Sequence, residues 1–247
     1  MASKHEEIAE QLIEEILSGR YRATDRLPSE RDLAARFQVN RGAVREAMKR
    51  LEQLGLAAVQ PGGARVQALE DSSLDVVGHL LQRGSLPDAE LVDAILEVLN
   101  ALVRVAAEGA LVNATEEQLQ ALRRLVAPLV AGNLDVDSHQ AARLELMGAF
   151  METSGNLVCR LIARALLEQF APRMEPLRPF ADEELDIPAY TAYYQQLDAA
   201  IANRNVDALN LALKGFSDLN RETIMRAFLA AKIAEQQSPQ YAEAALS

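Results

Sequence analysis

The segment from Ser29 to Leu69 constrains the fold of this chain most, because it combines two short helices and a hairpin. Ser29 can accept a hydrogen bond from the backbone at a helix start, and Asp32 follows three residues later, as in a capping box with a short acid. The helix that begins here ends near Gln38, and Val39-Asn40 form a turn. The segment therefore opens with a short helix and a turn.

A second helix follows over about residues 41–54, and Gly55 ends it. Its apolar positions recur at helical spacing and predict a buried stripe of Val44, Ala47, Met48 and Leu51. Two short apolar runs come next, Leu56–Gln60 and Ala64–Leu69, with Pro61-Gly62-Gly63 between them. Two strands around a glycine turn predict a β-hairpin.

This second helix carries a basic face opposite its apolar stripe. Arg41, Arg45 and Lys49 repeat every four residues and therefore share one side. Residues 31–69 include seven basic and three acidic residues, whereas residues 71–247 include 14 basic and 25 acidic ones. A locally basic arm on an acidic protein fits a molecule that contacts phosphates through one face. Arginine suits bidentate contact with guanine or a phosphate, although a solvated helix face is the alternative explanation.

Three blocks, Leu27–Ala34, Val39–Ala47 and Leu51–Leu56, resemble the DNA-binding region of the GntR family of transcription regulators. The resemblance implies a winged helix-turn-helix over residues 1–70, in which the hairpin is the wing. It implies that Arg31, Arg41 and Arg45 contact the operator. Asn40 and Gly42 flank them at recognition-helix positions. Together with the basic face, the predicted DNA-contacting residues are Arg31, Asn40, Arg41, Gly42, Arg45, Lys49, Gly62 and Arg65.

The wing is where the chain departs from the family pattern. The resemblance implies that the tip at Gly62 enters the minor groove. Gly63 stands where some family members carry a basic residue, and Arg65, two positions later, is the candidate substitute.

After the hairpin, residues 71–88 are predicted to be a linker with some helical character, and every later pattern is helical. One of these helices is entered through a capping box of Thr115 and Gln118. The expected fold is mostly α, with an all-α helical bundle over residues 89–235 and a polar tail over residues 236–247.

Phe150–Asn156 and Ala199–Ala208 resemble segments of the all-helical sensor domain of the FadR-type branch of that family. The resemblance implies that residues 89–235 bind an effector and dimerise. Most members of the branch hold a divalent metal with one Asp and three His. The matching positions here are Arg143, Met147, Tyr194 and Phe216.

None of these four side chains is an ordinary metal ligand. The histidines of the chain are His5, His79 and His139, which lie in unlike segments and are interpreted as surface or linker residues. We therefore expect neither a metal nor another cofactor.

The four positions form the predicted effector pocket, which is mainly apolar and has Arg143 as a partner for an anion. By the same resemblance, the fatty-acid regulator that names the branch also lacks the metal and senses acyl-coenzyme A thioesters. We therefore expect a fatty acyl thioester or another amphiphilic metabolite as effector. The alternative is that these side chains fill the core and that the regulator has no effector.

An enzyme is not expected. The sequence offers no Ser/His/Asp or Cys/His constellation and no glycine-rich phosphate loop. Cys159, the single cysteine, lies on an apolar helix and is interpreted as a core residue; a disulfide framework within the chain is excluded. Glu30, Asp32 and Glu46 are interpreted as caps and surface partners rather than as acid–base pairs.

These observations predict a ligand-responsive transcription regulator, either repressor or activator, that binds a pseudo-palindromic DNA operator as a homodimer. A scaffold whose winged helix binds a protein is the alternative. The charged N-terminus resembles no signal peptide, and no apolar run approaches the roughly 20 residues that span a bilayer. A cytoplasmic protein without a membrane partner is therefore expected.

Overall fold

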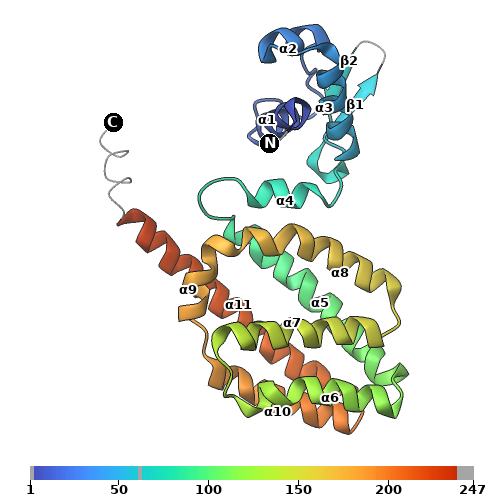
Figure 1. Cartoon of the computed structure of the whole chain (residues 1–247), viewed down its shortest axis with the longest axis vertical. Helices are drawn as coiled ribbons and strands as arrows, with labels where there is room; N and C mark the ends of the chain where they lie inside the picture. Colours follow the sequence, from blue (N-terminus) through green and yellow to red (C-terminus); the bar gives the residue numbers. More distant parts are fainter. Residues whose placement is uncertain (1–2, 61–62, 238–247) are drawn as a thin grey trace. The chain divides into compact units, whose positions relative to one another are not determined.

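The computed structural model describes residues 3–60 and 63–237 and divides the chain into two compact units, residues 1–85 and 86–247. Helices dominate both units, and the described strands form one two-stranded antiparallel sheet, in the first unit (Figure 1). The predicted fold class, mostly α with a small hairpin after two short helices, is confirmed. No helix among the described residues is long and apolar enough to cross a membrane.

The first unit is built on helix α3 (Arg41–Gln53), against which α1 (Lys4–Leu17) and α2 (Glu30–Phe37) both pack. The cap at Ser29 is present, because its side chain accepts a hydrogen bond from the Asp32 backbone N–H. Asn40 caps α3 in the same way by accepting from the Ala43 N–H at 2.9 Å. The predicted stripe of α3 is fully buried within the core of this unit.

Strands β1 (Ala57–Gln60) and β2 (Gly63–Val66) pair in the register Ala57 with Val66 and Gln60 with Gly63. The second strand is shorter than the predicted apolar run, because the chain turns into a 3₁₀ helix at Leu69–Asp71. The predicted wing tip at Gly62 lies outside the described residues.

Gly55 sets the path from α3 into the hairpin. Its φ of +72° belongs to the left-handed region, and a Cβ there would lie 2.8 Å from the Asp71 carbonyl oxygen. Both the torsion and the close approach of a second backbone segment therefore require glycine at this position.

The segment 71–88, predicted as a linker, contains helix α4 (Val76–Leu81), which packs against α1. Val76 belongs to the core of the first unit, and His79 Nδ1 lies 3.3 Å from Glu10 Oε2. This part of the segment is therefore folded onto the first unit.

The second unit is an all-α bundle. Its long helices are α5 (Ala89–Asn113), α6 (Glu116–Ala131), α7 (Val136–Thr153), α8 (Leu157–Phe170), α10 (Ile187–Ala202) and α11 (Val206–Gln236), with the short α9 (Arg178–Glu183) before α10. Helix α5 packs against α7, α8 and α11, and α10 packs against α6 and α11. The predicted capping box of Thr115 and Gln118 is present at the start of α6.

Candidate nucleic-acid interface and ligand cavity

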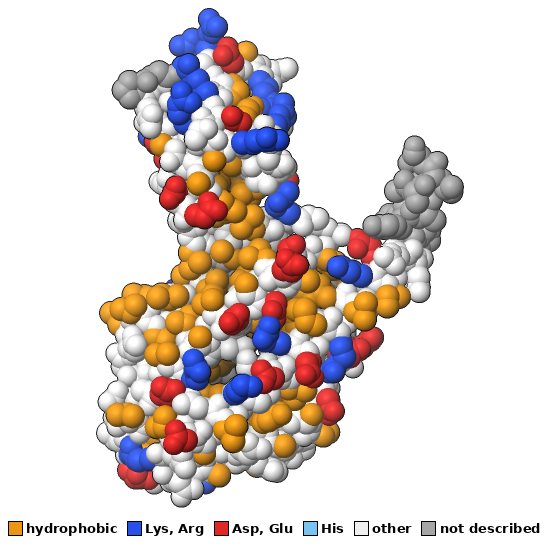
Figure 2. Space-filling view, turned by 180° about the vertical axis from the view of Figure 1, so that it is seen from behind, with side chains coloured by type: hydrophobic (Ala, Val, Ile, Leu, Met, Phe, Trp, Pro, Cys, Tyr) orange, Lys and Arg blue, Asp and Glu red, His pale blue; other side chains and the backbone are white. Residues whose placement is uncertain are grey.

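Helix α3 presents its basic residues on the side opposite the core. Arg41, Arg45 and Lys49 are all exposed, whereas Val44 and Leu51 on the other side have no exposed surface. Figure 2 shows Lys and Arg side chains gathered on the first unit, whereas acidic and apolar side chains are prominent on the same view of the second unit. The first unit therefore displays an amphipathic helix whose exposed side is cationic.

An ion pair joins the start of α2 to this basic side. Arg45 Nε lies 2.9 Å from Glu30 Oε2, and the next residue, Arg31, is highly exposed. Lys49 pairs with Glu46 on its own helix at 2.8 Å. Both ion pairs lie at the surface, so water screens them strongly and a phosphate can displace the carboxylates at modest cost.

Asn40 and Gly42 act together at the start of α3. The Asn40 side-chain oxygen caps the helix, and a Cβ on Gly42 would lie 3.1 Å from that oxygen. The structure therefore gives Asn40 a capping role that the sequence interpretation had not assigned to it.

Not every arginine of the basic stretch is displayed. Arg36 donates hydrogen bonds to both carboxylate oxygens of Glu15, one of them at 2.9 Å, and its guanidinium lies 4.8 Å from the Phe37 ring centroid. The Glu15 side chain is only 9% exposed, and the Arg36 hydrogen bond lowers the pKa of its carboxyl group. Arg36 therefore joins α2 to α1.

One arginine beside the wing, Arg26, was missed by the sequence interpretation. Arg65 on β2 is exposed and donates to the Thr24 carbonyl at 2.9 Å, and Arg26 lies opposite it in an isolated β-bridge. Arg26 is also exposed and lies beside Gly63. Its position follows from pairing with a strand 39 positions later in the chain, which no local pattern could indicate.

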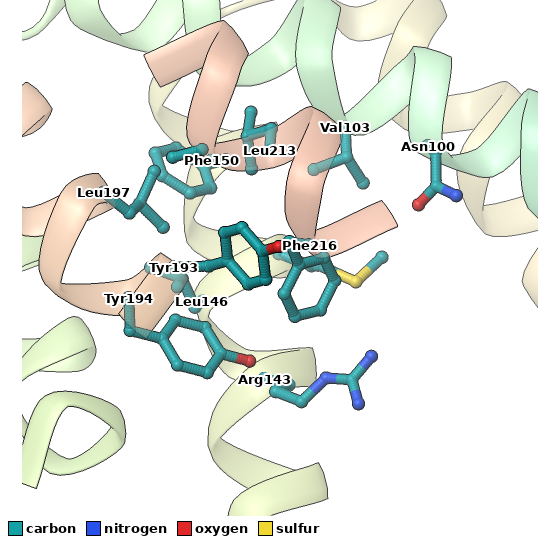
Figure 3. A pocket seen from close by; sticks show the side chains of 12 residues that line it. Asn100, Val103, Arg143, Leu146, Phe150, Tyr193, Tyr194, Leu197, Leu213 and Phe216 are labelled. Atoms are coloured by element: carbon teal, nitrogen blue, oxygen red, sulfur yellow. The ribbon is translucent and has the colours of Figure 1, made fainter. Parts of the chain in front are cut away.

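Two cavities among the described residues of the second unit share lining residues. The inner cavity measures about 50 Å³ and is lined by the predicted effector residues Arg143, Met147, Tyr194 and Phe216 (Figure 3). The outer cavity measures about 470 Å³ and shares Asn100, Arg143, Met147 and Phe216 with the inner one. Helices α5, α7, α10 and α11 thus bring residues that lie far apart in the sequence to one place.

Arg143 is held by aromatic rings. Its guanidinium carbon lies 5.1 Å from the Tyr190 ring centroid and 4.7 Å from that of Phe216, which are cation–π distances. Its Nη2 donates to Asn220 Oδ1 at 2.7 Å. These contacts fix a permanent positive charge at the junction of the two cavities.

His139 corrects the sequence interpretation of the histidines. It was expected at the surface, yet it is only 1% exposed and lies on α7 one turn before Arg143. Its ring contacts Tyr190 and Tyr194 edge-on, each with centroids 5.8 Å apart. Burial, reinforced by the Arg143 charge, lowers the pKa of His139 to about 4, so the ring is neutral at pH 7.

A sequence signal for the burial of His139 does exist. His139, Arg143, Leu146 and Phe150 follow one another at helical spacing on a single side of α7. Read as one stripe that ends in a leucine and a phenylalanine, this pattern predicts an inward-facing histidine.

The side chains at the positions implied for a metal do not fit one. They are a guanidinium, a thioether, a phenol and a phenyl ring, and a fixed guanidinium repels a cation. Within residues 3–60 and 63–237, no group of three His, Cys, Asp or Glu side chains is arranged to hold a metal ion.

A winged unit with an exposed basic helix, followed in one chain by a helical bundle with a cavity, is the architecture of a DNA-binding transcription regulator. Residues 4–66 match the family described as bacterial regulatory proteins, gntR family, and residues 94–216 match the FCD domain.

The curated relatives are regulators as well. The HTH-type transcriptional regulator Mce2R of Mycobacterium tuberculosis is 29% identical over 231 residues, which cover 89% of this chain and 91% of Mce2R. The uncharacterized HTH-type transcriptional regulator Rv0494 of the same species is 31% identical over 82% of this chain and 85% of its own length. The chain belongs to the gntR family and is a DNA-binding transcription regulator, not an enzyme.

The fold has counterparts among solved structures. Lar, which controls the expression of the Listeria monocytogenes agr system, aligns over 92% of this chain and 98% of its own with a TM-score of 0.51 and 17% identity. At this identity the similarity concerns the fold alone.

Proposed function

We propose that the chain regulates transcription as a homodimer that inserts α3 of each first unit into the major groove of a pseudo-palindromic operator. The observation that carries this proposal is the exposed basic side of α3 opposite a fully buried apolar side. A B-DNA major groove is about 12 Å wide and admits one helix in this orientation. Two units related by a two-fold axis would then read two half-sites.

The proposed DNA contacts fall into two kinds. Arg41 and Arg45 reach base edges from the start and middle of α3, with Asn40 and Gly42 beside them and Arg31 and Lys49 on flanking phosphates. The wing, through Gly62, Arg65 and the added candidate Arg26, contacts the adjacent backbone or minor groove. The exposure of these arginines and of Lys49 supports this assignment.

The replacement Arg45→Ala tests the DNA-reading proposal. A base-edge contact contributes roughly 1–3 kcal/mol, so operator affinity should fall about fivefold to more than a hundredfold in a gel-shift titration. Because phosphate contacts release counterions, specific binding by the unaltered protein should weaken steeply with salt. Unchanged operator binding by Arg45→Ala would contradict the docking, and binding without salt dependence would favour the scaffold alternative.

We also propose that the second unit dimerises through an apolar surface on α8 and α5, which we call the α8 surface. Six side chains of this surface are between 42% and 64% exposed: Val98, Val105, Leu157, Val158, Leu161 and Ile162. An exposed apolar patch on one side of packed helices is typical of an association site.

The proposed effector is an amphiphilic metabolite, with a fatty acyl thioester as the first candidate. An outer cavity of about 470 Å³ with leucines in its lining and one arginine at its inner end supports this proposal. Calorimetry with acyl thioesters of several chain lengths tests it. The absence of both heat and any change in operator affinity would leave the alternative, a regulator without an effector.

A further inference from the structure

Two buried polar atoms of residues that line the inner cavity lack hydrogen-bond partners among the described residues. Neither the Tyr194 hydroxyl nor Asn100 Nδ2, both buried, has a hydrogen-bond partner in the part of the chain that the structure describes. Tyr194 is 3% exposed, and Figure 3 shows its hydroxyl directed toward Arg143, with Asn100 elsewhere on the cavity wall. Because a buried polar group without a partner costs free energy, this arrangement favours a ligand that supplies hydrogen-bond acceptors.

The charge at this place is positive. Arg143 is the charged side chain that lines both cavities, and its five N–H groups exceed what Asn220 accepts. The acidic side chains of the outer cavity have their own partners: Asp137 pairs with Arg178, and Glu175 lies 3.9 Å from Arg178. In the described part of the chain no carboxylate pairs with Arg143, so an anion bound there would meet a guanidinium without a counter-ion.

The outer cavity fits the rest of such a ligand. Its lining includes Leu96, Leu99, Leu144, Leu167, Phe170 and Leu177, and its volume suits an extended apolar chain. The inner cavity, at about 50 Å³, has room for only a few water-sized groups. The two sizes fit a small polar head group joined to a long apolar body.

We infer that the effector is an organic monocarboxylate with an extended apolar body, whose carboxylate binds Arg143 directly, without a metal, and accepts a hydrogen bond from the neighbouring Tyr194 hydroxyl. This inference rests on the effector part of the proposed function, an amphiphilic metabolite, and places a carboxylate before the thioester as the candidate head group. The guanidinium supplies the positive charge that a bound cation would supply at the positions of the implied metal. A thioester would place an uncharged carbonyl at Arg143, and the phosphates of its coenzyme A moiety are too large for the inner cavity of about 50 Å³.

Titration calorimetry on the full chain tests the head group with three probes that share a ten-carbon acyl chain: decanoate, decanamide and decanoyl-coenzyme A. We expect decanoate to bind about tenfold to a hundredfold more tightly than decanamide, because one charge-assisted contact is lost. We expect its affinity to be the same with EDTA and with added Zn²⁺. Arg143→Met should abolish the preference for decanoate, and Arg143→Lys should keep part of it.

Arg123→Met is the matched control, because Arg123 pairs with Asp198 in the same unit and lines neither cavity. It should bind decanoate as the unaltered protein does. Thermal unfolding establishes that each variant is folded. If Arg143→Met does not fold, the carboxylate contact is tested by Arg143→Lys and by the comparison of decanoate with decanamide.

The outcomes distinguish this inference from the effector proposal and the DNA-reading proposal. Equal binding of decanoate and decanamide, or a requirement for Zn²⁺, overturns the direct carboxylate contact but leaves an effector site. Binding of the thioester alone overturns the inference and supports the thioester proposal. If no probe binds while operator binding persists, the inference and the effector proposal both fail, and the DNA-reading proposal stands.

Discussion

Two arginines five positions apart on the first unit have opposite roles. Arg31 lies on the first turn of α2, and its side chain is 79% exposed. Arg36, near the end of the same helix, is hydrogen-bonded to the nearly buried Glu15. Sequence composition counts them equally, but only an exposed arginine can reach a phosphate without first breaking an internal ion pair.

Replacement of each arginine by alanine should separate stability from DNA binding. Arg36→Ala leaves the Glu15 carboxylate with Arg20, 2.7 Å away, as its remaining cationic partner, and should lower the free energy of unfolding by about 1–2 kcal/mol in urea titrations. Arg31→Ala should leave that free energy within about 0.5 kcal/mol and weaken operator binding. The assignment would be contradicted if Arg31→Ala destabilised the protein as much as Arg36→Ala does.

His139 should make stability depend on pH in a defined window. Its pKa in the folded protein is about 4 against an ordinary value of 6.5, so the unfolded chain binds a proton at pH values where the folded protein does not. Stability is therefore undiminished above pH 6.5 and is lost as the pH falls toward 4, by up to about 3 kcal/mol. Urea titrations of the second unit's unfolding between pH 7 and 4.5 measure this loss.

His139→Leu should flatten the dependence in that window, since leucine carries no proton. The window lies above the ordinary pKa of 4.5 for Glu15, whose carboxylate contributes stability that is lost only at lower pH. Equal slopes for the two proteins would show that His139 does not titrate as a buried ring.

At the scale of elements, glycines at helix ends direct the chain. Gly19 and Gly55 both have a positive φ, +80° and +72°, after helices α1 and α3. A Cβ on Gly19 meets nothing within 4 Å, whereas one on Gly55 would clash with backbone atoms at Asp71 and Ser72. Both glycines have a left-handed φ, but only Gly55 lies close to a second segment of backbone.

Gly55→Ala should therefore cost more stability than Gly19→Ala. The left-handed torsion alone costs roughly 1–2 kcal/mol, which is the expected loss for Gly19→Ala. Gly55→Ala should add a clash that shifts the segment after the hairpin, for a total of about 3 kcal/mol or more in urea unfolding. Equal losses for the two variants would mean that the chain at Asp71 moves freely.

At the scale of the whole molecule, dimerisation would couple the two units functionally, because a pseudo-palindrome is read by two copies. Leu161→Glu places a charge in the middle of the α8 surface and should convert the dimer to a monomer in sedimentation equilibrium. Operator affinity should fall with it. Leu211→Glu, on α11 and 68% exposed, is the control and should remain dimeric. A dimeric Leu161→Glu variant would place the interface elsewhere.

Features that depend on neighbours along the chain could be predicted from the sequence alone. Helix spacing, the caps at Ser29 and Thr115, the basic side of α3 and the resemblance of three short blocks were sufficient for the fold class and the family. Local rules suffice there, because capping and helix sidedness involve residues three or four positions apart.

The three-dimensional packing, by contrast, sets which polar groups are buried and which partners they have. It placed His139 in the core, paired Arg36 with Glu15, moved Arg26 beside the wing, and left Tyr194 and Asn100 unsatisfied beside a cavity in the part of the chain that it describes. Each of these facts arises where segments distant in sequence pack together, so solvent is excluded by partners that no local window contains.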